Sequence, residues 1–238
     1  MDKKILLSSA VIGFGLLCAG FFPGYYYYHT AMDTRTVSVK GLAEKDVRAD
    51  LAIWNIRFQV AGNDILVAMK ELKSQQNLIE AFLTKAGFDA DEIIIEGLTM
   101  QDAYADSYRD KSTISARYTI NQNIMVRSKK VDLVNTTFPT IGNLVSQGVI
   151  FNSYGNNVSY VYTKLNDIKP EMLKQATINA KAAADEFANN SGSKVGKIRK
   201  ANQGVFSITA REQAQDQYEG NQIDKKVRVV STVEYFLE

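Results

Sequence analysis

The sequence predicts an α+β protein with one or more largely antiparallel sheets and about three helices, after one N-terminal transmembrane helix. Three observations lead to this prediction. The chain starts with a long apolar run, several segments alternate apolar and polar residues as half-buried strands do, and others place apolar residues at helical spacing. The strand-like segments are joined by short polar turns as well as by helices, which favours hairpins mixed with crossovers.

The composition of the 238-residue chain is that of a folded protein. Apolar residues make up 45% and charged residues 23%, close to the average for globular domains. The net charge of +2 is too small to predict nucleic acid as a partner. The single cysteine, Cys18, lies in the apolar run, so the remainder of the chain suits an oxidising compartment such as the periplasm.

Residues 1–30 are expected to form a membrane anchor. The apolar run from Ile5 to Phe22 is about 18 residues long, or roughly 27 Å as a helix, enough to cross a hydrocarbon core. Lys3 and Lys4 precede it and predict a cytoplasmic N-terminus with an exported remainder. Four residues that follow the run are expected to lie at the lipid–water interface: Tyr25, Tyr26, Tyr27 and Tyr28.

A cleaved signal peptide is the alternative for this segment. The small residues in Cys18-Ala19-Gly20 could serve as a cleavage site, and the protein would then be soluble in the periplasm. We favour the uncleaved anchor because the apolar run is long for a signal peptide. The expected location is therefore the inner (cytoplasmic) membrane, as a single-pass protein with its C-terminal domain in the periplasm.

The first exported elements are predicted from alternation and from helix caps. Residues 36–40 form a short strand, and 51–60 alternate strictly enough to predict a half-buried strand. Asp64 is placed to cap a helix over 65–86, whose apolar residues recur at steps of three, four or seven. Gly87 is expected to end that helix.

A long hairpin and a divided helix are expected next. Strands near 93–104 and 114–127 would pair across a polar turn at 106–111. The helix predicted over 130–147 contains Pro139, which would bend or divide it.

The remaining elements follow a similar order. A strand over 149–165, with a kink near Tyr154-Gly155-Asn156, precedes a helix that Asp167 could cap. Strands over 198–210 and 226–237 close the chain. The buried stripe of the helix is expected to consist of Leu173, Ala176, Ala180, Ala183 and Phe187. This order of elements suggests two βαβ-type halves, 35–128 and 129–238.

Several segments resemble the SIMPL domain, a bacterial domain of unknown function found in periplasmic immunogenic and oxidative-stress-defence proteins. The resemblance covers about residues 35 to 238 and is carried by Val37-Ser38-Val39-Lys40-Gly41, Ala49-Asp50-Leu51-Ala52, Ala180-Lys181-Ala182-Ala183-Ala184, Gly192-Ser193-Lys194-Val195-Gly196 and Val227-Arg228-Val229-Val230. The chain departs from the family pattern at Leu42-Ala43, where Gly-x-Gly is frequent, and at Ala49, where proline is common. The resemblance implies an exported α+β protein, often oligomeric and loosely linked to envelope or oxidative stress. No catalytic residues are established for the family, so none are carried over.

One basic cluster stands out in the exported part, and it follows the alanine-rich helix. One interpretation is a solvated strand edge whose charges prevent aggregation. The other is a surface that contacts anionic lipid headgroups or an acidic protein partner. The cluster consists of Lys194, Lys197, Arg199 and Lys200.

The residue types favour a protein that is not an enzyme. The lone histidine, His29, adjoins the apolar run, so neither a Ser-His-Asp set nor a His/Cys zinc site is expected in the domain. Asp102, Asp106 and Asp110 lack the alternate spacing of a calcium loop and are expected at a solvated hairpin tip. We expect no cofactor and no metal.

The function that these patterns favour is that of a cell-envelope protein. We expect it to be anchored in the membrane, to form homo-oligomers or bind other partners, and to have a role in envelope or oxidative stress. The alternative is a periplasmic binding module for a small apolar or lipid-like ligand, held between helices and sheet.

Overall fold

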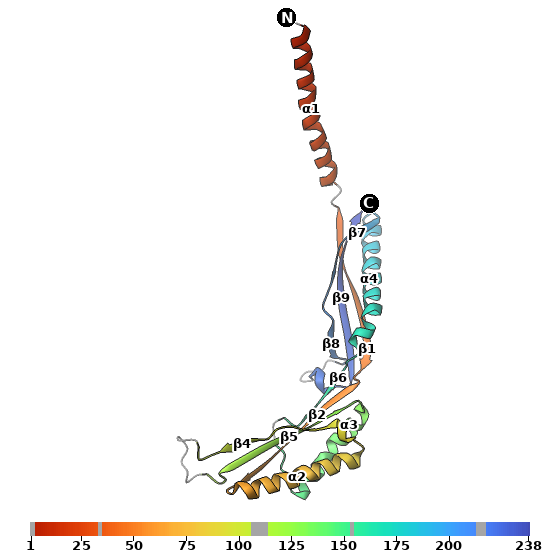
Figure 1. Ribbon diagram of the computed structural model, residues 1–238. Coiled ribbons are helices and arrows are strands. Elements are labelled where there is room, and N and C mark those ends of the chain that lie inside the picture. Colours follow the sequence, from red (N-terminus) through yellow and green to blue (C-terminus); the bar gives the residue numbers. More distant parts are fainter. Residues whose placement is uncertain (1–2, 33–34, 106–113, 153–154, 213–217) are drawn as a thin grey trace. The chain divides into compact units, whose positions relative to one another are not determined.

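The computed structural model describes residues 3–32, 35–105, 114–152, 155–212 and 218–238, and in the first helix it describes the side chains of residues 12–27. Within these residues the chain forms four α-helices and nine strands (Figure 1). The strands assemble into one four-stranded and one five-stranded sheet, and every strand pair with a defined register is antiparallel. The predicted α+β class with antiparallel sheets is therefore confirmed.

Helix α1 (Lys3–Met32) is apolar and contains Pro23. Its described apolar side chains are exposed all round, including Ile12, Phe14 and Leu17. Among the residues that the structure describes, no helix is both long and apolar enough to span a membrane.

The five-stranded sheet has the order β3-β5-β2-β6, with β4 also paired to β5. Its strands are β2 (Leu51–Gly62), β3 (Ile93–Ile95), β4 (Thr99–Asp102), β5 (Tyr118–Ser128) and β6 (Asn157–Val161). Alternate residues of β2 and β5 are buried, so one face of this sheet carries the core and the other is partly open. The predicted hairpin turn at 106–111 lies outside the described residues, as does Tyr154 in the predicted kink.

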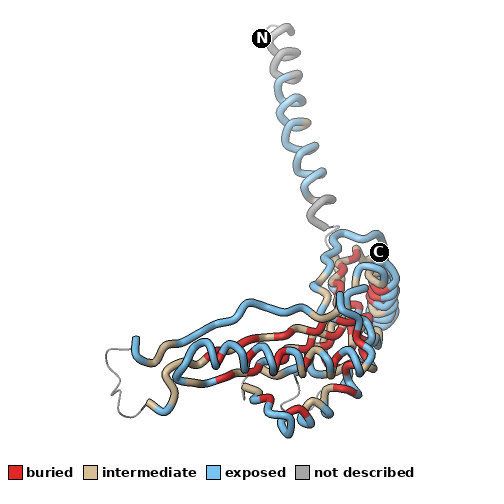
Figure 2. Tube along the Cα trace, turned by 60° about the horizontal axis from the view of Figure 1, so that its bottom comes forward, coloured by how far each residue is buried: buried red, intermediate tan, exposed pale blue. Residues whose placement is uncertain are grey.

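Helices cover the core face of this sheet (Figure 2). The Asp64 carboxylate accepts hydrogen bonds from the first backbone N–H groups of α2 (Ile65–Ala86), and Gly87 ends the helix in the left-handed conformation. Both caps confirm the prediction. Pro139 separates α3 (Val131–Thr137) from the 3₁₀ helix η3 (Phe138–Gln147), as expected. A shorter 3₁₀ helix, η1 (Ala90–Glu92), precedes β3.

The four-stranded sheet has β9 between β1 and β7, with β8 also paired to β9. Its strands are β1 (Thr36–Arg48), β7 (Val195–Gln203), β8 (Ser207–Ala210) and β9 (Asp224–Leu237). The 3₁₀ helix η4 (Glu219–Asn221) precedes β9. Helix α4 (Leu165–Asn190) packs on one face of this sheet, where a core forms from Val39, Ala180, Ala184, Val233 and Tyr235.

Alanine allows α4 to approach the sheet closely. The buried residues of the helix recur every four positions: Met172, Ala176, Ala180, Ala184 and Ala188. The predicted stripe is wrong at Phe187, which is 63% exposed, and at Leu173 and Ala183, which are only partly buried. The reason is steric, because a row of small residues lets the two backbones meet where an aromatic ring would not fit.

Four strand boundaries also differ from the predicted ones. β1 continues to Arg48 through charged residues, because it pairs with β9, which is distant in sequence. β6 is only five residues long, and Phe151, before it in the chain, forms an isolated bridge to Phe58. The strand predicted over 93–104 is two short strands, and the one over 198–210 is interrupted between β7 and β8.

The chain forms two compact units, each assembled from separate stretches. One unit comprises Met1–Glu44, Lys169–Ser207 and Arg228–Glu238, and the other comprises Lys45–Ile168 and Ile208–Val227. The strand β9 contributes residues to both units, and the halves 35–128 and 129–238 stay a prediction.

Candidate functional site

The face of the four-stranded sheet that is turned away from α4 holds a polar recess. In β1 the buried residues alternate with exposed ones, so Ser38 and Lys40 lie on the face opposite Val39. Three neighbouring strands supply the lining, and the recess has a volume of about 260 Å³. Its residues are Ser38 from β1, Lys200 and Asn202 from β7, and Thr232 and Glu234 from β9.

A β-bulge in β7 brings two cations to one carboxylate. Ile198 pairs with Tyr235 and Lys200 pairs with the next residue, Glu234, so Arg199 is an extra residue without a partner in the register. Arg199 Nη1 donates a hydrogen bond of 2.7 Å to Glu234 Oε1. The bulge thus places both Arg199 and Lys200 beside Glu234.

Glu234 is held in its ionised form by these neighbours. A hydrogen bond from the Thr36 side chain and another from Arg199 lower the pKa of Glu234 below its usual range, and the charges of Arg199 and Lys200 act in the same direction. The carboxylate therefore remains charged at neutral pH and keeps the Arg199 guanidinium in place.

The four residues of the predicted basic cluster have different surroundings. All four are exposed and lie on β7 or just before it, and β7 is on the opposite side of β9 from β1. Lys194 exchanges two backbone hydrogen bonds with Glu238, Lys197 is not among the residues that line the recess, and Arg199 is ion-paired with Glu234. Lys200 is the member of the cluster that lines the recess.

Three of the four predicted interface tyrosines can be placed. Tyr25, Tyr26 and Tyr27 are exposed on α1, and Tyr25 stacks on Phe21 with ring centroids 5.9 Å apart. The side chains of Tyr28 and His29 lie outside the described residues.

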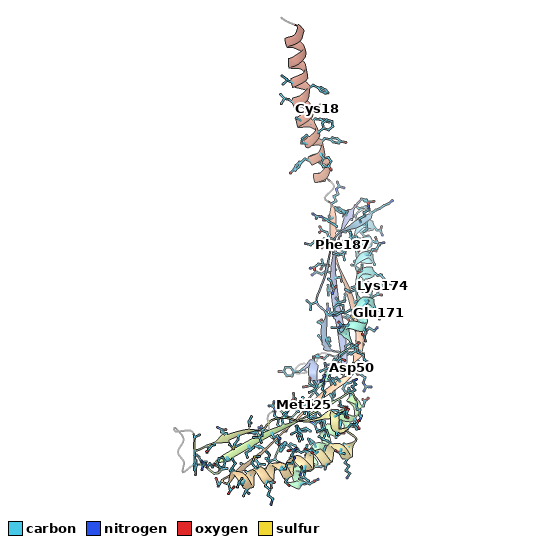
Figure 3. The ribbon with its side chains drawn as sticks, viewed as in Figure 1. Cys18, Asp50, Met125, Glu171, Lys174 and Phe187 are labelled. Atoms are coloured by element: carbon cyan, nitrogen blue, oxygen red, sulfur yellow. The ribbon has the colours of Figure 1, made fainter. Side chains whose placement is uncertain are left out.

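A second groove lies on the other side of the same sheet, between α4 and β7. It has a volume of about 270 Å³ and a mostly apolar lining that includes Leu173, Ile198 and Val233. Glu171, Lys174 and Phe187 follow one another along α4 (Figure 3).

The aspartates considered for calcium are only partly described. Asp102 accepts hydrogen bonds from Arg117, at 2.9 Å from Nη2, and the guanidinium lies over the rings of Tyr104 and Tyr118. Asp106 and Asp110 lie outside the described residues. Within the described part of the chain, no cluster of three or more His, Cys, Asp or Glu side chains is arranged to hold a metal ion.

Two polar networks were not foreseen from the sequence. Lys225, on β9, is fully buried, and its ammonium donates hydrogen bonds to the side chain and backbone carbonyl of Glu219. Asp50 accepts hydrogen bonds from the backbone N–H and the hydroxyl of Thr163, at 2.7 and 2.8 Å. Partial burial acts to raise the pKa of Asp50, but the hydrogen bonds from Thr163 outweigh it and leave that pKa below its usual value.

The recess itself contains residues that sequence reasoning missed. Ser38, Asn202, Thr232 and Glu234 are polar residues at alternate positions of strands. That alternation is visible in the sequence and indicates the open face of a sheet. The sequence does not show which strands are neighbours, so it could not bring the four residues together.

The chain contains two antiparallel sheets, and each is covered on one face by helical segments. It is therefore an α+β protein whose folded part follows an N-terminal apolar helix. The SIMPL family model, described as a protein of unknown function (DUF541), matches residues 37–235. The chain therefore belongs to the SIMPL family, which confirms the resemblance seen in the sequence. None of the proteins with curated descriptions matches it.

Proposed function

We propose that this protein is a non-enzymatic component of the cell envelope, held in the cytoplasmic membrane by its N-terminal segment with the SIMPL domain in the periplasm. On this proposal it acts by binding partners, including further copies of itself. A role in envelope or oxidative stress would then depend on binding, because the sole cysteine lies in the N-terminal segment.

The observation that carries the proposal is the exposure of apolar side chains around α1. Phe14 is 70% exposed and Leu17 is 72% exposed, and a helix that is apolar on all sides needs an apolar environment. Further support comes from the sequence, in which Lys3 and Lys4 precede the apolar run and tyrosines follow it.

Fractionation combined with intact-mass measurement tests the anchor. We expect the full-length mass in a membrane pellet that resists carbonate extraction. Phe14→Arg should move the protein out of that pellet, because an arginine at the centre of a span costs about 2.5–3.5 kcal/mol. Leu66→Arg is the matched control, since Leu66 is exposed on α2. A mass lacking about the first 20–30 residues in a soluble extract would instead identify a processed periplasmic protein.

Self-association is supported by one edge of the five-stranded sheet. The strands β3 and β4 lie at that edge, and Ile94, Ile95, Leu98 and Met100 in and between them are 38–48% exposed. Exposed apolar residues on an edge strand are a site for pairing with another chain. Light scattering of the detergent-solubilised protein should give a mass above that of the monomer.

A lysine at this edge tests whether it forms the interface. Ile95→Lys should reduce the oligomer because it introduces charge into an apolar edge. Leu66→Lys should leave the oligomer intact, although it also replaces an exposed leucine. A wild-type chain that is monomeric at all concentrations would contradict self-association.

The groove beside α4 favours a second candidate, a binding module for a small apolar or lipid-like ligand. Its support is the apolar lining contributed by Leu173, Ile198 and Val233. Native mass spectrometry of the protein purified without added lipid should then show a bound molecule. Val233→Trp places a large side chain in the groove and serves as the variant for comparison. If wild type and Val233→Trp both have the mass of the chain alone, this candidate is excluded.

A further inference from the structure

The open face of the four-stranded sheet carries an excess of positive charge. Its charged side chains come from three strands and include, within one compact unit, Lys40, Glu44, Arg199, Lys200, Arg228 and Glu234. Arg199 is paired with Glu234 at 2.7 Å, and Arg228 with Glu44 at 3.7 Å. Within the described residues, neither Lys40 nor Lys200 forms an ion pair within 4 Å. Lys200 and Arg199 share the charge of Glu234, so this group has one positive charge in excess, and Lys40 adds a second.

Hydrogen-bond donors surround one of these two lysines. Lys200 lines the recess together with Ser38, Thr232 and Asn202, whose side chains carry two hydroxyls and an amide. These four groups come from three adjacent strands, so they can approach a bound group from different sides. Glu234 also lines the recess, and it is ion-paired with Arg199.

We propose that this recess binds a terminal phosphate group, of the kind found on a phosphomonoester. Such a group carries a charge of about −1.5 to −2 at neutral pH and three strong acceptor oxygens. A tetrahedral group can accept from an ammonium, two hydroxyls and an amide at once, whereas a planar carboxylate offers two oxygens. The recess, at about 260 Å³, accommodates a phosphate group and leaves the rest of a larger molecule outside.

The proposal goes beyond the anchoring and assembly proposed above. The recess itself depends on neither, and only the nanodisc test uses the N-terminal segment as an anchor. The phosphate could belong to a lipid headgroup or to a small soluble molecule, and the chemistry of recognition is shared. Binding is measured directly, so a failure here would leave the fractionation and light-scattering results unaffected.

The test uses the full-length protein in nanodiscs of phosphatidylcholine, titrated calorimetrically with inorganic phosphate and with glycerol 3-phosphate. A second arm replaces part of the phosphatidylcholine with phosphatidic acid, which carries a terminal phosphate on a lipid, and measures binding of the protein's domain by crosslinking to the headgroup. Saturable binding in the first arm assigns a soluble phosphate. Binding in the second arm alone assigns the lipid headgroup.

Variants of neighbouring residues decide whether the recess is responsible. Lys200→Gln should weaken phosphate binding about tenfold, because it removes a charged hydrogen bond. Thr232→Val should weaken it about threefold, since it removes one neutral donor. Lys197→Gln is the matched control, an exposed lysine of the same strand that does not line the recess, and its affinity should change by less than about twofold.

Two results would overturn the proposal. One is the absence of saturable binding in both arms. The other is an equal loss of affinity in Lys197→Gln and Lys200→Gln, which would show that phosphate responds only to the general charge of the strand. Circular dichroism of each variant verifies that the exposed substitutions leave the fold intact.

Discussion

Replacing Gly41 with alanine tests how closely β1 approaches α4. A Cβ atom at this position would lie 1.8 Å from the carbonyl oxygen of Ala176, 2.6 Å from the nitrogen of Ala180 and 2.8 Å from its Cβ. Ordinary contact begins near 3.4 Å, so the strand and the helix would have to separate by about 1.6 Å. The clash is with helix backbone, which cannot rotate away as a side chain could.

The expected loss of stability follows from that separation. A gap of 0.5–1 Å already forfeits about a quarter to a half of the dispersion energy across an interface, and overpacking of a core costs about 1–3 kcal/mol or more. Because backbone meets backbone here, we expect Gly41→Ala to lower the free energy of unfolding by at least about 3 kcal/mol. The packing of Ala176 and Ala180 against the sheet should be disrupted first.

Urea unfolding of the full chain in a non-ionic detergent, followed by far-ultraviolet circular dichroism, measures this loss. Gly97→Ala is the control, because a Cβ at Gly97 would meet nothing within 4 Å, and it should stay within about 0.5 kcal/mol of wild type. Trp54 belongs to the other compact unit, so its fluorescence gives a separate read-out. A free energy for Gly41→Ala within about 0.5 kcal/mol of wild type would refute the close approach of β1 to α4.

Three further predictions concern the unit that contains Trp54. Because the folded-state pKa of Asp50 is lowered, its ionised carboxylate contributes stability above its unfolded pKa of about 4, and that contribution is lost as the pH falls through the folded value. Asp50→Asn should therefore have a lower melting temperature than wild type at pH 6, and the difference should fade in acid. A difference in melting temperature that does not depend on pH would contradict the role of Thr163. Glu219→Ala leaves the fully buried Lys225 ammonium without its carboxylate and should cost about 3 kcal/mol in urea unfolding. Lys225→Met should cost less, because the Glu219 side chain is 43% exposed and its carboxylate stays hydrated; the reverse order would show that the Lys225 ammonium is not buried. Trp54, the only tryptophan, is fully buried against Phe88 and Phe138, so acrylamide should not quench its fluorescence until the unit unfolds.

Local signals in the sequence were sufficient for the elements whose determinants are close together in the chain. Asp64 and Gly87 mark the ends of α2 because caps act within a few residues. The division at Pro139 follows from the loss of one backbone donor. The alternation of β9 was visible in the sequence because, along much of the strand, one face is buried and the other is more exposed.

Elements that depend on distant partners were not predictable in the same way. The charged end of β1 forms a strand because β9, nearly two hundred residues away in sequence, provides its hydrogen-bond partners. The bulge at Arg199 is a property of the register with Glu234, and no local pattern indicates it.

The candidate site was predictable only in its residue types. Lys200 was part of the basic cluster identified from the sequence, but the partners that give it a defined environment come from β1 and β9. Their convergence requires a sheet order that composition and spacing do not contain. The contact between Gly41 and the backbone of α4 explains in physical terms why a glycine suits the segment that follows Val37-Ser38-Val39-Lys40.

The position of β9 has a consequence for synthesis of the protein. This strand follows β1 and β7 in the chain, and it pairs with both of them and contributes residues to both compact units. Contacts between the two ends of a chain have a high contact order and form slowly. Neither unit can therefore be completed before β9 has been synthesised, so the stretches of both units that precede it wait for their last strand.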